Sequence, residues 1–128
     1  MKEELIKKIV PAFEDDRGAI FDILDGVEIC HIGMITSKAG AIRGNHYHKL
    51  ATQYIYVLDG TIEVDTADYV EEKPPQNQTK CIMRKGDLTV HKPMQIHSVK
   101  SIGDSTILVF TTHERLGSQG YEKDTYRV

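Results

Sequence analysis

Short apolar stretches, separated by turn-forming residues, run through almost the whole of this chain. The clearest apolar and β-branched stretches lie at 27–36, 54–58, 81–84 and 106–111. Their lengths are typical of strands, and no stretch shows the sustained periodicity of a long helix. The pattern predicts roughly eight to ten short strands, which indicates an all-β sandwich or barrel.

Local signals predict several of these elements in more detail. Residues 1–10 fit either a short helix or an edge strand, and 13–22 predicts two strands joined by a turn. Residues 27–36 are mostly apolar and predict a buried strand. Asp59-Gly60 lies between two apolar runs and is typical of a β-hairpin. Residues 71–80 are polar, contain two prolines and predict a surface loop.

Length and composition narrow the class of protein. A chain of 128 residues predicts a single domain, 1–128. A net charge of −3 argues against a nucleic-acid partner, which requires a basic surface. No apolar run reaches the roughly 18 residues of a membrane span, and the charged N-terminus does not resemble a secretory signal. We therefore expect a cytoplasmic protein with no membrane partner, in which Cys30 and Cys81 are buried, reduced thiols.

Three histidines and a glutamine form a candidate metal site. His46 and His48 are two residues apart, so in a strand their side chains point to the same face. Gln53 follows at the start of an apolar run, and His97 lies in a second glycine-bounded segment. Imidazoles bind divalent transition metals, and this donor set leaves one or two coordination positions open. Alternatively, the histidines are unrelated polar residues at strand ends. His31, inside an apolar stretch, is more typical of a core residue than of a ligand.

The spacing of these residues resembles the cupin superfamily. Its first motif, G-x5-H-x-H-x4-E-x6-G, is matched in every spacing by Gly40, His46, His48, Gln53 and Gly60, with glutamine in place of the usual glutamate. The second motif is matched only loosely. The segment from Gly86 to His97 keeps the separation, Pro93 is displaced by one position, Met94 replaces a glycine and Ser101 replaces an asparagine.

The resemblance implies a double-stranded β-helix, the jelly-roll cupin barrel, with a divalent transition metal in its mouth. It implies His46, His48, Gln53 and His97 as ligands for Zn, Fe, Mn or Ni. Because Gln53 is neutral, the site keeps the full charge of the ion. This lowers metal affinity and makes the ion a stronger Lewis acid.

Flanking residues are similar to those of the sugar-nucleotide cupins. Phe13-x-Asp15-x-Arg17-Gly18 and the run Arg43-Gly44-Asn45-His46-Tyr47-His48 resemble dTDP-4-dehydrorhamnose 3,5-epimerases, 3,4-ketoisomerases and cupin domains of capsular polysaccharide enzymes. Asp124-Thr125-Tyr126 matches the ending of the last group. The resemblance implies an epimerase or isomerase that acts next to a carbonyl of a sugar nucleotide or sugar phosphate, in polysaccharide or deoxysugar biosynthesis. The catalytic tyrosine and Asp–His pair of the rhamnose-type epimerases have no evident counterpart here.

Proton abstraction next to a carbonyl requires a base with a pKa near neutrality, which suits histidine. Without a metal, His46 and His48 would act as base and acid. With a metal they would be ligands, and a separate base is needed. The sequence leaves five candidates unranked: Tyr47, Tyr54, Tyr56, His91 and Glu63.

Two arginines are candidates for binding the diphosphate of a sugar nucleotide. Arg43 and Arg17 carry guanidinium groups that pair with phosphate in a bidentate way. Alternatively, both are surface charges that stabilise loops.

Two other functions fit the same residues. One is a metal-dependent dioxygenase or lyase, which would use a redox-active ion at the histidines. The other is a non-catalytic cupin that binds a small molecule. For all three functions we expect a homodimer, because antiparallel sheets have edges that need covering.

Overall fold

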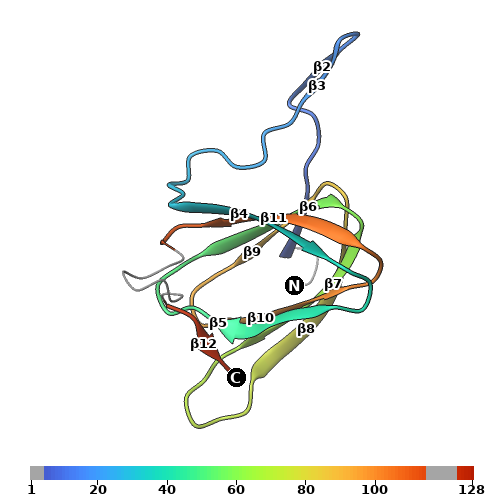
Figure 1. The fold of residues 1–128 in the computed structure, drawn as a ribbon. Coiled ribbons are helices and arrows are strands. Elements are labelled where there is room, and N and C mark those ends of the chain that lie inside the picture. The colour runs from blue at the N-terminus through green and yellow to red at the C-terminus, as the bar shows by residue number, and fades with distance from the viewer. Residues whose placement is uncertain (1–4, 115–123) are drawn as a thin grey trace.

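The computed structural model describes residues 5–114 and 124–128. These residues form twelve strands (Figure 1). The strands are β1 (Ile6–Lys8), β2 (Phe13–Asp15), β3 (Gly18–Ile20), β4 (His31–Ser37), β5 (Ile42–Tyr47), β6 (Gln53–Asp59), β7 (Thr61–Asp68), β8 (Gln76–Arg84), β9 (Asp87–His91), β10 (Gln95–Ser101), β11 (Ser105–Thr111) and β12 (Tyr126–Arg127). The described part of the chain contains no helix with the length and apolar character of a membrane span.

Ten of the strands form two antiparallel sheets that face each other. One sheet has the order β1-β9-β6-β11-β4 and the other the order β12-β5-β10-β7-β8. Figure 1 shows the two sheets face to face, with the strands of one above those of the other. This arrangement confirms the predicted all-β jelly-roll fold.

The hydrophobic core fills one end of the space between the sheets. Alternate residues of β6, β7, β8 and β11 point inward and pack together, as strand geometry requires. The buried members of this cluster are Ile55, Val57, Ile62, Val64, Met83, Ile107 and Val109. Each such side chain contributes about 1.5–3 kcal/mol through removal from water. The core therefore fixes the two sheets rigidly beside the open end.

The predicted hairpin at Asp59-Gly60 is wrong, because the chain changes sheets there. β6 and β7 belong to different sheets and do not pair. Gly60 has a φ of 89°, and a Cβ added to it would lie 2.9 Å from the Cα of Ser105. Only glycine tolerates both the left-handed backbone and this close approach. The same residue types that make a hairpin turn thus make a corner between two sheets.

A two-stranded ribbon projects from the barrel. Strands β2 and β3 pair only with each other, as predicted for 13–22, and Figure 1 shows them extending well away from both sheets. Several large apolar side chains of the ribbon and its base are exposed: Val10, Phe13, Ile20 and Phe21. An isolated two-stranded ribbon is marginally stable in water.

Other local expectations are corrected by the pairing. The predicted loop at 71–80 is strand from Gln76 onward, because β8 pairs with β7. The strand expected at 27–36 is β4, and it is buried on one face only, since Ile32 is 63% exposed. Cys30 is exposed and Cys81 is half-buried, rather than both being buried, and neither forms a disulfide among the described residues. Within the ambiguous segment 1–10, β1 is an edge strand that pairs with β9.

Candidate metal centre and its cavity

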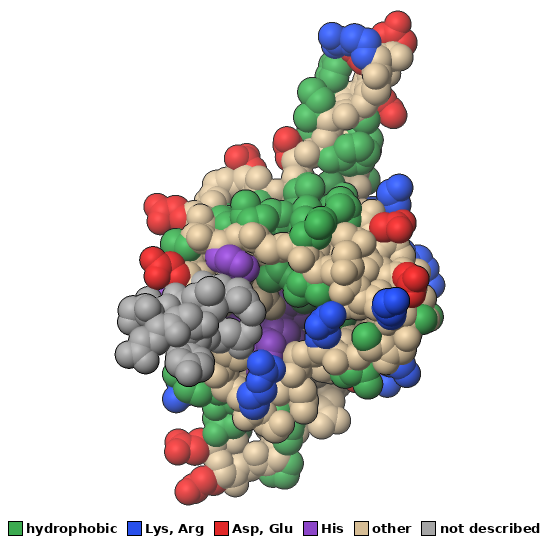
Figure 2. Space-filling model, viewed as in Figure 1, with side chains coloured by type: hydrophobic (Ala, Val, Ile, Leu, Met, Phe, Trp, Pro, Cys, Tyr) green, Lys and Arg blue, Asp and Glu red, His purple; other side chains and the backbone are tan. Residues whose placement is uncertain are grey.

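A cavity of about 870 Å³ occupies the open end of the barrel. Strands from both sheets line it, together with the segment that contains Asp124. Its lining includes five of the predicted site residues: Arg43, His46, His48, Gln53 and His97. Figure 2 shows histidine side chains within this hollow and arginine or lysine side chains beside it. The cavity is large enough for a sugar ring with attached groups.

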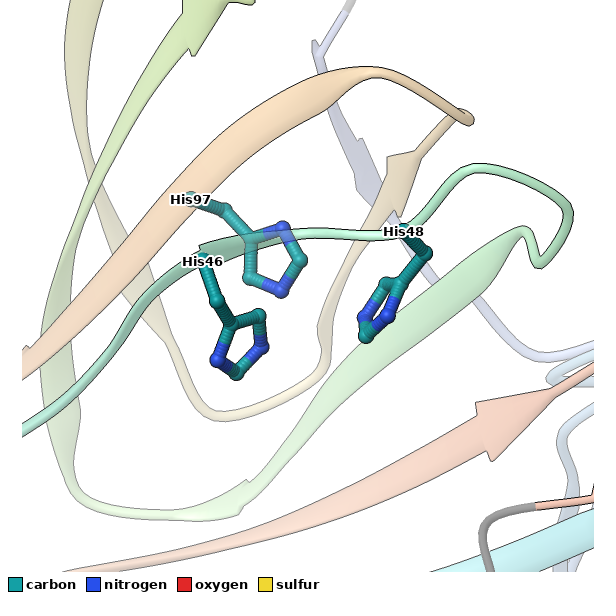
Figure 3. A group of neighbouring side chains, drawn as sticks. All are labelled: His46, His48 and His97. Carbon is teal, nitrogen blue, oxygen red and sulfur yellow. The ribbon is translucent and has the colours of Figure 1, made fainter. Parts of the chain in front are cut away.

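The three histidines come together because β5 and β10 pair closely. His46 lies opposite His97 in the register, and His48 follows β5 on the same face. The ligand nitrogens of the three side chains all lie within 4.8 Å of one another (Figure 3). The structure thus brings together all three histidines predicted from their spacing.

A β-bulge in β5 makes this approach possible. The register shifts between His97 and Ser98, so that Asn45 has no opposite residue on β10, and Gly44 and Asn45 both have positive φ. A Cβ on Gly44 would lie 2.9 Å from the carbonyl oxygen of His97. Glycine therefore lets the two backbones meet, and the bulge turns His46 toward the cavity.

His48 and His97 have the tautomer that a metal ligand needs. The Nδ1 of His48 lies 2.8 Å from the carbonyl oxygen of Asp124, and the Nδ1 of His97 lies 3.3 Å from that of Gln95. A carbonyl only accepts, so each Nδ1 carries the proton and donates. Each Nε2 is then a lone-pair donor, and both Nε2 atoms are buried with no hydrogen-bond partner among the described residues. Metal-binding histidines are commonly oriented by such second-shell carbonyls.

His97 is held in the neutral form. Burial lowers its pKa well below the ordinary value, and the neighbouring His91, His46 and His48 lower the pKa further. A neutral imidazole is the form that binds a metal.

His46 is bonded differently from the other two. The Nη1 of Arg127 lies 3.0 Å from the Nδ1 of His46 and 3.3 Å from the carbonyl oxygen of Gly44. Arg127 follows Tyr126 in β12, which pairs with β5. A guanidinium only donates, so the Nδ1 of His46 accepts a hydrogen bond.

His91 packs beneath the cluster and supports it. Its ring is fully buried, 4.8 Å from the ring of His97. Both ring nitrogens are hydrogen-bonded, Nε2 to the hydroxyl of Thr89 at 2.9 Å and Nδ1 to the side-chain oxygen of Gln95 at 3.3 Å. Burial lowers the pKa of His91 to about 4. With both nitrogens engaged and no access to the cavity, His91 is a packed neutral histidine rather than a base.

Asp124 fixes the loop that follows His48. Its carboxylate accepts hydrogen bonds from the backbone N–H groups of Lys49, Leu50 and Ala51 at 2.8 to 2.9 Å. Burial raises the pKa of Asp124, but these hydrogen bonds outweigh it and the pKa lies below its ordinary value. The same residue therefore holds both the loop, through its side chain, and the tautomer of His48, through its carbonyl.

The structure does not bring Tyr47 and Tyr56 to the cavity. Tyr47 alternates with His46 and His48, so it points to the opposite face of the sheet, where its ring stacks on Tyr69 at 4.2 Å. Tyr56 alternates with two core residues of β6 and is directed away from them. Neither tyrosine lines the cavity.

The two arginines are placed very differently. Arg43 lines the cavity and donates to the Ser37 hydroxyl at 2.8 Å and to the Thr36 carbonyl at 3.1 Å. Arg17 lies on the projecting ribbon, in a 2.6 Å ion pair with Asp15 that lowers the pKa of that carboxyl. Arg17 is therefore remote from the cavity of its own chain.

Sequence reasoning missed His31 as well as Arg127 and the role of Asp124. His31 lines the cavity, and its Nδ1 is buried with no hydrogen-bond partner among the described residues. Its ring lies over Gly33, where a Cβ would be 3.1 Å from the ring carbon Cε1. The alternation of β4 could have predicted this position of His31. In a strand, His31 and Gly33 share the face of Ile35, which points inward.

Comparison with known proteins places the chain in a family. The profile of the family described as "Polysaccharide biosynthesis C-terminal domain" matches residues 13–126. No curated protein matches the chain by sequence.

Several solved structures share the fold. The dTDP-4-dehydrorhamnose 3,5-epimerase from Sulfolobus tokodaii superimposes with a TM-score of 0.71 and 21% identity, over 88% of this chain and 70% of that protein. The rmlC epimerase from Mycobacterium tuberculosis superimposes with a TM-score of 0.74 and 17% identity, over 90% of this chain and 65% of that protein. The capsular polysaccharide assembling protein CapF from Staphylococcus aureus superimposes with a TM-score of 0.67 and 16% identity, over 94% of this chain but only 32% of CapF.

These likenesses confirm the resemblance to the sugar-nucleotide cupins at the level of fold. This chain spans about two thirds of the length of the two epimerases and about one third of CapF. The family profile covers most of the chain, including every histidine of the cluster. The chain belongs to the family of polysaccharide biosynthesis C-terminal domains.

Proposed function

We propose that this protein is a metal-dependent epimerase or isomerase that acts next to the carbonyl of a sugar nucleotide. One observation supports the metal: the Nε2 atoms of His48 and His97 are buried and lack hydrogen-bond partners within residues 5–114 and 124–128. They belong to a cluster whose ligand atoms lie within 4.8 Å of one another. Leaving two buried acceptors unpaired is costly unless something binds them. A divalent ion such as Zn, Fe, Mn or Ni matches their chemistry.

The chain supplies a neutral donor set. His46, His48 and His97 would hold the ion, and Gln53 lines the same cavity with an amide oxygen as a further donor. No carboxylate belongs to the cluster of described residues, so the ion would keep its full charge. A bound ion would stabilise the negative charge that develops on the carbonyl oxygen when a neighbouring carbon loses its proton.

His31 is the group best placed to move that proton. With the cluster histidines as ligands, the base must be another side chain in the cavity. Tyr54 and Tyr56 share the outward face of β6, and His91 is enclosed in the core, so none of the three lines the cavity. Glu63 is paired with Lys80 on β8. His31, His113 and Glu114 do line the cavity. His113 and Glu114 are exposed, whereas His31 is half-buried, and imidazole is the most frequent general base in enzymes.

Arg43 is the candidate for holding the substrate. Its guanidinium lines the cavity and is oriented by hydrogen bonds to Ser37 and Thr36. Guanidinium pairs with a diphosphate in a bidentate way. Anchoring the nucleotide part at Arg43 would present the sugar to the histidines deeper in the cavity.

The test combines metal content with proton exchange. The protein is purified without a histidine tag, and bound metal is measured beside His48→Ala. His113→Ala removes a histidine that lines the cavity but lies outside the cluster, so it is the matched control for metal binding and also tests His113 as an alternative base. Each protein is then incubated in D2O with a nucleotide 4-keto sugar, and NMR follows deuterium uptake at the carbons next to the carbonyl.

We expect about one equivalent of metal and deuterium uptake in the wild type and in His113→Ala, and loss of both in His48→Ala. His31→Ala should keep the metal and lose the exchange. Exchange by a metal-free wild type would refute the metal role and make His46 and His48 acid and base. Oxygen uptake with bound iron or nickel would favour the dioxygenase or lyase. Tight sugar binding without exchange would favour a binding protein.

We also propose that the protein is a homodimer. The ribbon of β2 and β3 exposes Phe13 and Ile20, and β4 at the edge of its sheet exposes Ile32 and Met34. Exposed apolar strands and open edges are normally covered. Light scattering should give twice the mass of one chain, and the mass of a single chain would refute the proposal.

A further inference from the structure

We propose that Arg127 and the metal ion compete for His46, so that the position of this one guanidinium controls metal occupancy of the three-histidine cluster. The inference rests on the metal site of the proposed function. It adds a residue that is not a ligand and that acts through His46.

The argument begins with the hydrogen bond between Arg127 and His46, which is 3.0 Å from Nη1 to Nδ1. A guanidinium has donors and no acceptor, so the Nδ1 of a neutral His46 must be the acceptor. The remaining proton of the ring then lies on Nε2. A metal binds the nitrogen without a proton, and neither nitrogen of His46 is available while this bond exists.

The other two histidines show the opposite arrangement. His48 and His97 each donate from Nδ1 to a backbone carbonyl, which leaves Nε2 ready to bind a metal. His48 and His97 therefore have the tautomer that binds a metal through Nε2, whereas Arg127 holds His46 in the other tautomer. Loading all three requires Arg127 to leave the Nδ1 of His46.

Arg127 is suited to such a movement. It is exposed, lines the opening of the cavity and lies in the short strand β12 at the edge of its sheet. Its hydrogen bond to the carbonyl oxygen of Gly44 is 3.3 Å long. Its positive charge beside the cluster also repels a divalent cation. Both effects lower metal affinity in the observed arrangement.

The direct test is the tautomer of each histidine in metal-free protein. Long-range proton–nitrogen NMR spectra distinguish the two neutral tautomers. We expect His46 to carry its proton on Nε2, and His48 and His97 to carry theirs on Nδ1. Finding His46 with its proton on Nδ1 would overturn the inference, because Arg127 would not be donating to it.

The second test measures affinity for Co²⁺ and Zn²⁺ by chelator competition, with the visible absorption of Co²⁺ reporting the ligand set. Arg127→Met keeps the aliphatic part and removes the donors. We expect it to bind both ions about tenfold more tightly, as for loss of one hydrogen bond to a charged group. Arg127→Gln should bind both ions at least as tightly as Arg127→Met, because an amide oxygen can accept a hydrogen bond from the Nδ1 of His46. It replaces Arg127→Met in the test if that variant does not fold.

Arg43→Met is the matched control. It removes the same charge from the same cavity, but Arg43 is bonded to Ser37 and Thr36 and to no histidine in these contacts. We expect its metal affinity to stay within about twofold of wild type. Equal tightening in both variants, or no tightening in Arg127→Met, would overturn the inference. Loss of exchange activity with the affinities as expected would refute only the proposed reaction. No metal binding by any variant would refute the metal site and this inference together.

Discussion

His91 should make the stability of the metal-free protein depend on pH in the mildly acidic range. Burial lowers its pKa from 6.5 to about 4 in the folded state. In the unfolded chain the ring titrates near 6.5, so below that pH the unfolded state binds a proton that the folded state does not. Stability is therefore fully present above pH 6.5 and falls as the pH is lowered toward 4. Each pKa unit corresponds to about 1.4 kcal/mol, so the loss from His91 is about 3 kcal/mol.

This loss is a large part of the 5–15 kcal/mol by which domains are usually stable. His97 changes stability in the same direction, because burial also lowers its pKa. The carboxyl groups of Asp15 and Asp124 have pKa values below 3.8, so they titrate below this window. The two buried histidines thus dominate the expected pH dependence between 6.5 and 4.

The assay is urea unfolding followed by circular dichroism, at several pH values between 7 and 4, with a chelator present. The matched variant is His91→Gln, whose amide can still bond to Thr89 or Gln95 but does not titrate. We expect the wild type to lose about 3 kcal/mol more than the variant over this range. Parallel curves for the two proteins would refute the reasoning, since the ring would then titrate equally in both states.

Three further predictions concern other parts of the molecule. Gly60→Ala should lower the free energy of unfolding by about 2–4 kcal/mol, because its φ is 89° and its new Cβ would meet Asp104 and Ser105, whereas Gly103→Ala meets no atom within 4 Å and should be nearly neutral in the same urea titration. Asp124→Ala should cost about 2 kcal/mol and weaken Zn²⁺ binding, since the loop that follows His48 loses its acceptor; unchanged affinity in a chelator competition would contradict this role. Tyr47→Phe should keep metal binding and deuterium exchange, because the ring lies outside the cavity; loss of exchange would return its hydroxyl to the reaction.

The histidine cluster could be predicted because it follows from strand alternation and from the spacing of residues within two short segments. His46 and His48 share a face in any strand, and His97 follows a second glycine-bounded segment of matching length. The faces of Tyr47 and Tyr56 follow from the same alternation, since neither can share the face of its neighbours His46 or Ile55. Both tyrosines were named on residue type, and strand geometry places both side chains outside the lining of the cavity.

The rest depended on pairings that local chemistry does not determine. Asp59-Gly60 has the residues of a hairpin turn, and only the choice of partner strands makes it a corner between sheets. Arg127 and Asp124 act on His46 and His48 through contacts between residues far apart in the sequence. A two-residue strand such as β12 carries no periodicity from which its pairing could be inferred.

The pairing of β12 with β5 has a consequence for how the native protein opens locally. β12 has two residues and lies at the edge of its sheet, so its pairing contributes few hydrogen bonds. Short edge contacts of this kind open at a low free-energy cost, while the strands of the core stay folded. The barrel and its three histidines can therefore stay assembled when β12 detaches. In that locally opened state the guanidinium of Arg127 leaves His46, and the cluster meets the metal ions of its surroundings without that competitor.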